Sequence, residues 1–171
     1  MPTFTRFPSP VGELVLAASD TALQRVFFPA PRNRWAPAEQ PEWVEDDGRG
    51  PAGAVLARVR GQLTEYFDGT RTSFDLPLDA AGSPFERRVW DLLRTIPYGA
   101  TTSYGALARR LGDPRATRAV GAANGKNPIP IIVPCHRVVG ARGELTGFGG
   151  GLDRKRWLLE HEGALLSLGR A

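Results

Sequence analysis

The stretch TTSYGALARRLGDPRATRAVGAANG, residues 101–125, decides the expected fold of the second half of the chain. Its apolar residues recur at the spacing of one helix face, at Tyr104, Leu107, Ala108 and Leu111. Gly112 and Pro114 stop that helix, and ATRAVGAANG then predicts a second short helix that ends at Gly125. Two short helices joined by a tight turn form the helix-turn-helix pattern, which also occurs in proteins that bind no DNA.

The second helix of this pair has an unusual composition for a helix that recognises DNA bases. Arg118 is its only long polar side chain, and its small residues are Ala119, Gly121, Ala122 and Ala123. A helix faced with small residues can lie close to a DNA backbone or groove floor, but it reaches few base edges. The composition favours close, largely sequence-independent docking. The alternative is that the small residues only permit tight packing between helices.

Helix signals also flank this pair. The motif SPFE at residues 83–86 predicts a capped helix start, and that helix should end before Pro97. A last helix is expected over residues 154–162, with Asp153 as its cap and Gly163 as its stop.

The first half of the chain predicts a small β-containing part. Two short apolar runs around SDTA, GELVLAAS and ALQRVFF, predict a β-hairpin, and residues 72–78, TSFDLPL, are a further strand candidate. Apolar residues recur at helical spacing over residues 54–67, and Gly69 offers a stop. Residues 33–50 should form a surface loop, and residues 79–83 a linker.

These patterns predict an α+β protein in two parts. Residues 1–80 should form a small N-terminal β-sheet domain with a helix. Residues 81–171 should form a mainly helical C-terminal domain that holds the helix-turn-helix and an active-site cysteine. A chain of 171 residues, 42% hydrophobic and 23% charged, suits such a globular protein.

The chain contains one cysteine, Cys135, which excludes an internal disulfide and a cysteine-cluster metal site. A free thiol suits a reducing compartment. The sequence has no apolar run long enough to span a membrane, and its N-terminus lacks the apolar core of a signal peptide. We therefore expect a soluble, intracellular protein.

Basic residues concentrate in the half that contains the cysteine. Residues 1–83 carry 8 basic and 11 acidic side chains, whereas residues 84–171 carry 14 basic and 7 acidic ones. A nucleic-acid-binding surface would require such an excess. The alternative is a generally arginine-rich composition, since only 2 of the 22 basic residues are lysines.

The stretch IPIIVPCHRVVG, residues 129–140, places the thiol at the end of an apolar run and beside an imidazole. A free cysteine has a pKa of about 8.5, so a catalytic cysteine needs a nearby base or cation. His136 is the main candidate base, and Glu162, near the buried stripe of the last helix, is the favoured carboxylate to orient it. The alternatives are an inert Cys135 and a solvated Glu162.

The sequence RAVGAANGKNPIPIIVPCHRVVG resembles the signature of the O6-alkylguanine-DNA alkyltransferases, which repair alkylated guanine. The similarity extends over residues 83–163, through SPFERRVWDLLRTIPYGATTSYGALARRLG upstream and LTGFGGGLDRKRWLLEHEG downstream. Residues 1–80 resemble the family only in size and layout, which implies a ribonuclease-H-like domain there. The proline-cysteine-histidine-arginine core is the most specific part of the match.

The resemblance implies irreversible, single-turnover transfer of an alkyl group from guanine O6 to Cys135, after the damaged nucleotide has rotated out of the duplex. His136 would act as base through a water molecule, oriented by Glu162, and Asn127 would support this hydrogen-bonded chain. Tyr104 would help turn the nucleotide and donate a proton to guanine N3. O4-alkylthymine is a further expected substrate.

The resemblance also implies a DNA surface and a base pocket. Arg118 matches the arginine that fills the vacated space in the duplex, and approach from the minor groove suits a helix of small residues. The expected DNA contacts are Tyr104, Thr117, Arg118, Ala119 and Ala123. The expected pocket residues are Pro130, Val138, Phe148 and Gly149. Many relatives carry a tyrosine where this chain has Phe148, and the glycines that follow suggest room for alkyl groups larger than methyl.

No cofactor is implied. Zinc is bound in some relatives by N-terminal cysteines and histidines, which residues 1–80 lack, so we expect no metal. The expected partner is double-stranded DNA that contains O6-alkylguanine, with no membrane. We further expect a cytoplasmic monomer that associates with the nucleoid on damaged DNA.

Three other functions share parts of this pattern. A lesion sensor without chemistry would lack Cys135. A transcriptional regulator switched by methylation would need a further cysteine-rich domain. A cysteine hydrolase would use Cys135 and His136 but would have no need of the helix-turn-helix.

Overall fold

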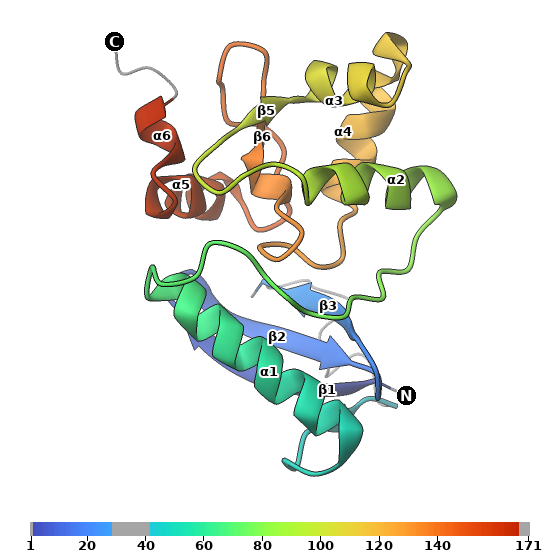
Figure 1. Cartoon of the computed structure of the whole chain (residues 1–171), viewed down its shortest axis with the longest axis vertical. Helices are drawn as coiled ribbons and strands as arrows, with labels where there is room; N and C mark the ends of the chain where they lie inside the picture. The colour runs from blue at the N-terminus through green and yellow to red at the C-terminus, as the bar shows by residue number, and fades with distance from the viewer. Residues whose placement is uncertain (1, 29–41, 168–171) are drawn as a thin grey trace. The chain divides into compact units, whose positions relative to one another are not determined.

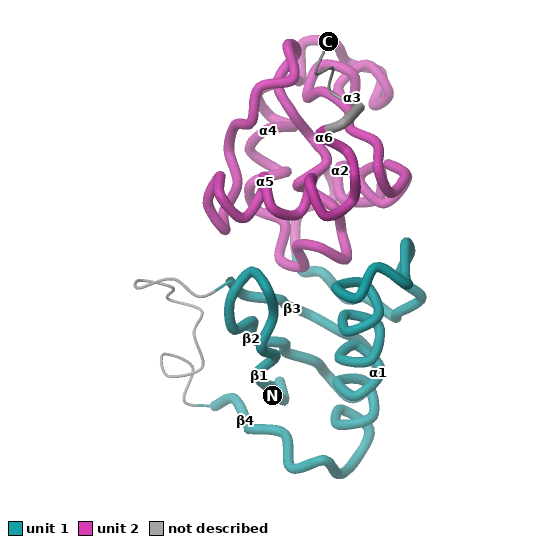
Figure 2. The backbone as a smooth tube through the Cα atoms, turned by 90° about the vertical axis from the view of Figure 1, so that its left-hand side faces the viewer, with its two compact units in different colours: residues 1–81 teal, residues 82–171 magenta. Residues whose placement is uncertain are grey.

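The computed structural model describes residues 2–28 and 42–167, and the chain divides into two compact units, Met1–Ala81 and Gly82–Ala171 (Figure 2). The division falls within residues 79–83, the expected linker. The first unit combines a sheet with a helix and the second is mainly helical, so the predicted α+β class is confirmed.

The first unit is built on a sheet with the strand order β3-β2-β1-β4, of which Figure 1 labels β1, β2 and β3. The strands are β1 (Thr3–Ser9), β2 (Gly12–Ala18), β3 (Leu23–Phe27) and β4 (Val44–Glu45). Neighbours β1, β2 and β3 pair antiparallel, whereas β1 and β4 pair parallel. The β2–β3 pair is the hairpin predicted around SDTA.

The sequence does not predict β1, because its residues TFTRFPS lack clear alternation and include a proline. Phe4 and Phe7 are its buried residues, and Pro8 has no N–H to donate. β4 pairs only with Thr3 and Phe4, so the Pro8 end of β1 has a neighbouring strand on one side alone, where proline is tolerated. Residues 33–41 of the expected surface loop lie outside the described residues.

Helix α1 (Gly50–Phe67) packs on one face of this sheet (Figure 1). Its fully buried residues are Leu56, Val59, Leu63 and Tyr66. The helix begins at Gly50 rather than at Ala54, since Pro51 is well tolerated in a first turn. It ends before Gly69, which has a φ of 80°, as predicted.

The predicted strand over residues 72–78 is wrong. The backbone of Asp75 is occupied by the side chain of Gln62, whose Nε2 donates to the Asp75 carbonyl and whose Oε1 accepts from the Asp75 N–H, each at 2.9 Å. These groups are therefore not available to a neighbouring strand. Only an isolated bridge between Leu78 and Leu23 remains.

The second unit consists of short helices and tight connections. Its helices are α2 (Pro84–Leu93), α3 (Tyr104–Arg110), α4 (Thr117–Gly125), α5 (Leu152–His161) and α6 (Ala164–Ser167), the last of which the sequence does not predict. Two 3-10 turns, η2 (Pro114–Ala116) and η3 (Cys135–Arg137), lie between them. The strands β5 (Thr102–Ser103) and β6 (Val138–Val139) pair parallel.

The predicted helix-turn-helix is formed by α3, η2 and α4. Gly112, with a φ of 86°, ends the first of these helices, and the Asp113 side chain caps the turn by accepting from the Arg115 N–H at 3.0 Å. Helix α2 packs against α4, where Trp90 Nε1 donates to the Ala123 carbonyl at 2.8 Å.

Helix α5 begins at Leu152, earlier than the predicted Arg154. The expected cap, Asp153, lies instead in the first turn, because Gly151 takes the N-cap position with a φ of 91° that a glycine adopts without strain. The predicted stop is correct, since Gly163 follows the helix with a φ of 74°.

The capping box of α2 provides a test of the fold. The Glu86 N–H donates to Ser83 Oγ at 3.1 Å, and the Ser83 N–H donates to Glu86 Oε1 at 2.8 Å. We expect Ser83→Ala to lower the free energy of unfolding by about 1 kcal/mol and to speed amide exchange in the first turn of α2. Urea titration and hydrogen exchange measure these effects. Ser73→Ala, in an exposed loop, is the control, and an equal effect of both changes would contradict the capping role.

Candidate active site

Asn127 holds the turn that leads to Cys135. Its Oδ1 accepts from the Ile129 N–H at 3.0 Å, and its Nδ2 donates to the Val133 carbonyl at 2.8 Å. Between these contacts Ile131 has a φ of 73°, the one positive φ of a non-glycine residue in the described part of the chain. The apolar run therefore forms a buried turn, which places Cys135 at the start of η3.

Cys135 is 5% exposed, and its burial raises the pKa of the thiol to about 11. A hydrogen bond with Asn127 and the positive charge of Lys155 both lower this pKa, but they do not outweigh burial. Such a thiol is protonated at neutral pH, so it needs a base before it can act as a nucleophile.

His136, the residue after Cys135, is completely buried, and its Nε2 lies 2.7 Å from Glu162 Oε2. Burial lowers the pKa of His136, so the imidazole is neutral at pH 7. A carboxylate can only accept a hydrogen bond, so Nε2 carries the proton and Nδ1 is left as an acceptor. This Nδ1 is buried and has no hydrogen-bond partner among the residues that the structure describes.

Glu162, directly after α5, is held as a carboxylate by two side chains. Burial alone would raise its pKa, but hydrogen bonds from His136 and Arg137 and the positive charge of Arg137 lower it to about 2. Arg137 donates from Nε to Oε1 at 2.8 Å and from Nη2 to Oε2 at 3.1 Å. A third bond, from Arg137 Nη1 to the Ile96 carbonyl at 2.7 Å, fixes the guanidinium.

Tyr104, the first residue of α3, lies against the loop that follows β6. Its hydroxyl donates to the Thr146 carbonyl at 3.2 Å. The same carbonyl accepts from Lys155 Nζ at 2.6 Å, and Lys155, on α5, has no exposed surface. A Cβ at Gly121 of α4 would lie 3.8 Å from the Tyr104 ring, so a small residue there leaves room for the ring.

The structure pairs four of the five expected catalytic residues, Asn127 with Cys135 and His136 with Glu162. It connects the fifth, Tyr104, to Lys155 through Thr146. The sequence does not indicate the contacts of Arg137 or Lys155. For Arg137, a long cation between the apolar stretches of residues 129–134 and 138–139 was an available signal, because a buried charge requires a partner.

The expected DNA-contact residues of α4 divide into two groups. Thr117, Arg118 and Ala119 are exposed. Ala123 is only 2% exposed and packs toward α2, where its carbonyl accepts from Trp90, so it does not share the exposed face of the other three. Its expected contact with DNA stays a prediction.

The expected pocket residues differ in exposure. Pro130 and Val138 are buried, the latter in β6, whereas Phe148 is half-buried and Gly149 is exposed. Phe148 and Gly149 belong to the loop before α5, whose Gly151 N–H donates to the Phe148 carbonyl at 2.9 Å.

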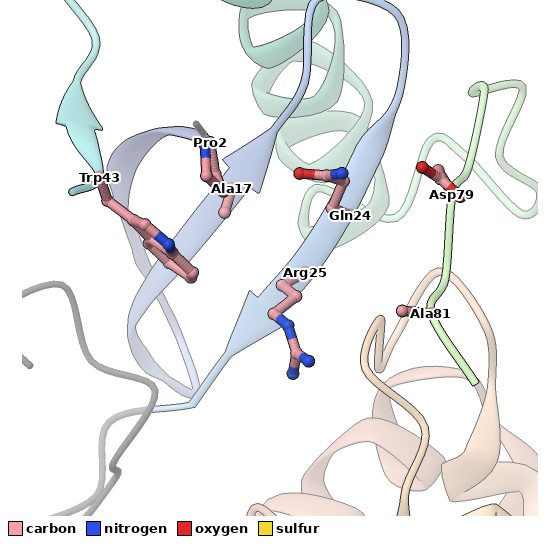
Figure 3. Close-up of a pocket in the computed structure, with 7 residues that line it drawn as sticks. All are labelled: Pro2, Ala17, Gln24, Arg25, Trp43, Asp79 and Ala81. Atoms are coloured by element: carbon pink, nitrogen blue, oxygen red, sulfur yellow. The ribbon is translucent and has the colours of Figure 1, made fainter. Parts of the chain in front are cut away.

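A separate small pocket lies in the first unit (Figure 3). Its lining residues are Pro2, Ala17, Gln24, Arg25, Trp43, Asp79 and Ala81. Within residues 2–28 and 42–167, no group of three His, Cys, Asp or Glu side chains is placed to hold a metal ion. None of the helices in the described residues is long and apolar enough to cross a membrane.

Comparison with known proteins matches both units to one family. Residues 3–80 match the ribonuclease-like domain of the 6-O-methylguanine DNA methyltransferases, and residues 84–164 match the DNA binding domain of the same proteins. A methylated-DNA--protein-cysteine methyltransferase of Mycolicibacterium paratuberculosis is 51% identical over 154 residues, which cover 90% of this chain and 88% of the relative.

Solved structures agree with this assignment. A crystal structure of Mycobacterium tuberculosis OGT in complex with DNA superposes with a TM-score of 0.83 at 45% identity, covering 97% of this chain and 98% of that one. The O6-methylguanine methyltransferase of the same organism has a TM-score of 0.81 at 47% identity, covering 100% of this chain and 96% of its own. The resemblance inferred from the cysteine signature is confirmed, and the chain belongs to the 6-O-methylguanine DNA methyltransferase family.

Proposed function

We propose that this protein repairs DNA by transferring the alkyl group of O6-alkylguanine to Cys135. The observation that carries the proposal is the buried arrangement of Cys135, His136 and Glu162. It supplies a nucleophile, a neutral imidazole with an open Nδ1, and a carboxylate that fixes the imidazole.

The thiol proton passes to His136 Nδ1, through a water molecule between the two groups. The thiolate of Cys135 then attacks the alkyl carbon, so that an S–C bond forms while the C–O6 bond breaks. The electron pair of the broken bond remains on guanine. Tyr104 donates its proton to guanine N3, which neutralises the departing base.

The product is a thioether on Cys135. None of the groups that we assign to the reaction can cleave a thioether, so each molecule acts once. O4-alkylthymine presents the same kind of carbon on an exocyclic oxygen, and the same displacement extends to it. Phe148 provides an apolar wall of the pocket, and the glycines that follow it leave room for alkyl groups larger than methyl.

Double-stranded DNA, bound through α4 from the minor groove, is the proposed partner. Arg118 and Ala119 are exposed on this helix, and small side chains let it lie close to the backbone. The alkylated nucleotide rotates out of the stack, and Arg118 fills the space that it leaves. Rotation costs a few kcal/mol, which this replacement offsets in part.

The central test is transfer of a labelled methyl group from O6-methylguanine in duplex DNA. We expect label on the protein to reach a plateau near one per molecule and Cys135→Ala to take up none while still binding the duplex. Mass spectrometry and a mobility-shift assay measure the two quantities. Continued release of product would favour a hydrolase, and binding without transfer by the unaltered chain would favour a lesion sensor.

Glu162 should contribute to folding as well as to transfer. Its pKa lies below the ordinary 4.5, so its stabilising contribution is present above pH 4.5 and is lost as the pH falls toward about 2. We expect Glu162→Gln to lower the free energy of unfolding at pH 7 by on the order of 3 kcal/mol, a difference that shrinks between about pH 4 and pH 2.

Transfer should also slow in this variant, because His136 loses its anionic partner. Urea titration at several pH values and single-turnover kinetics provide the measurements. Glu160→Gln, an exposed position on α5, is the control. A Glu162→Gln protein as stable as the unaltered one at pH 7 would contradict the electrostatic role.

Arg118→Ala should slow repair of duplex DNA by about tenfold or more, because the extruded state loses the side chain that replaces the base. Reaction with free O6-benzylguanine should be nearly unchanged, since no stack has to open. Arg115→Ala, an equally exposed cation in η2, is the matched control. Equal losses with both substrates would rule out a role in extrusion.

A further inference from the structure

The loop before α5 is rich in glycine and contains two of the expected pocket residues. Residues 147–151 have the sequence GFGGG, in which four of the five positions are glycine, and they include Phe148 and Gly149. Glycine loses more conformational freedom on ordering than any other residue, so such a segment is costly to fix in one conformation. The contacts that hold this loop therefore determine whether the pocket has one shape.

The start of the loop is held at Tyr104. The Thr146 carbonyl accepts from the Tyr104 hydroxyl at 3.2 Å and from Lys155 Nζ at 2.6 Å. A Cβ at Gly147 would lie 3.7 Å from the Tyr104 hydroxyl. The loop thus begins beside the side chain that, in the proposed function, protonates guanine.

The end of the loop is held by Arg154, on α5. Its Nη1 donates to the Gly150 carbonyl at 3.0 Å, and the Gly151 N–H donates to the Phe148 carbonyl at 2.9 Å. The Gly150 carbonyl and the Gly151 N–H belong to one peptide group, so both polar ends of that group are fixed. Gly149, just before this group, faces open space, because a Cβ there would meet no atom within 4 Å.

Arg154 has an unfavourable position for a cation within its helix. Helix α5 begins at Leu152, so Arg154 is the third residue of the first turn, where the partial positive charge of a helix N-terminus disfavours a cation. The first bond of the helix runs from the Lys155 N–H to the Gly151 carbonyl at 3.1 Å, which leaves the Gly150 carbonyl outside the helix. The guanidinium supplies a donor to this carbonyl. Holding the loop accounts for a cation at this position.

We propose that Arg154 is a positioning residue, which fixes the glycine loop and thereby determines which alkyl groups the pocket accepts. This inference rests on the proposed function. A fixed loop keeps Phe148 against a group as small as methyl, so that the reacting carbon stays aligned with the sulfur of Cys135. A released loop would move away from a methyl group, whereas a larger group would fill the wider pocket and remain oriented.

The experiment compares single-turnover transfer from O6-methylguanine and from O6-benzylguanine placed in the same duplex. We expect Arg154→Met, which keeps an apolar stem but has no donor, to slow methyl transfer by about tenfold and benzyl transfer by about twofold or less. The ratio of the two rates should therefore shift toward benzyl. A folding defect would lower both rates by the same factor and would leave this ratio unchanged.

Two further variants serve as controls. Arg156→Met removes an exposed cation from the same helix and should leave both rates unchanged. Arg154→Lys retains a donor and should restore part of the ratio of the unaltered chain. Circular dichroism establishes that each variant is folded. A folded Arg154→Met protein with the same ratio as the unaltered chain would overturn the proposal.

The order of the loop gives a second readout that needs no DNA. The full chain labelled with 15N-glycine has 20 glycine amides, and their relaxation reports on residues 149–151. In Arg154→Met we expect the order parameters of Gly149 and Gly150 to fall below about 0.6, and exchange of the Gly151 amide to speed up about fivefold. Gly163, at the other end of α5, should keep its values. A loop that stays equally ordered would also refute the proposal.

The two proposals fail in different ways. If the unaltered chain transfers neither group from duplex DNA, the proposed function is wrong, and the glycine measurements still test whether Arg154 holds the loop. If the unaltered chain transfers both groups, but the rate ratio or the order of the loop does not depend on Arg154, only the arginine inference is wrong.

Discussion

A buried carboxylate is the constraint on which the second unit depends. Glu162 is 5% exposed, and the cost of removing its charge from water is met only because His136 and Arg137 both reach it. These partners come from η3, 26 and 25 residues earlier in the chain. The end of α5 and the cysteine turn are therefore held together by charge-assisted hydrogen bonds, which are stronger than neutral ones.

This pairing also determines the chemistry. Because the carboxylate accepts from Nε2, the imidazole presents Nδ1 as its only open acceptor. Arg137 connects a further segment to this cluster, because its hydrogen bond to the Ile96 carbonyl holds the loop after α2 against it. An arrangement that stabilises an ionised glutamate thus fixes the tautomer and orientation of the base.

Local signals in the sequence were sufficient for several features of the fold. The Ser83 capping box and the glycine stops at Gly69 and Gly163 depend on neighbouring residues only, and they were predicted correctly. The strand assigned to residues 72–78 failed because a distant side chain, Gln62, occupies its backbone groups.

In the site, too, some residues could be predicted from the local sequence, whereas others depend on long-range packing. Cys135, His136 and Glu162 were predicted as a group from chemistry and spacing, and the structure places the last two in contact. The burial of Lys155 could not be predicted, because the helix sequence DRKRW gives no sign of which cation faces inward. That information exists only once α5 is packed.

The backbone conformation of Ile131 affects the stability of the turn that leads to Cys135. A β-branched residue at a φ of 73° carries strain of about 1–3 kcal/mol, and its side chain, only 1% exposed, regains about 1.5–3 kcal/mol by burial. The turn is therefore tolerable only while that side chain remains inside the unit. The turn that leads to Cys135 should therefore not unfold locally. It should unfold only together with the apolar core of the second unit.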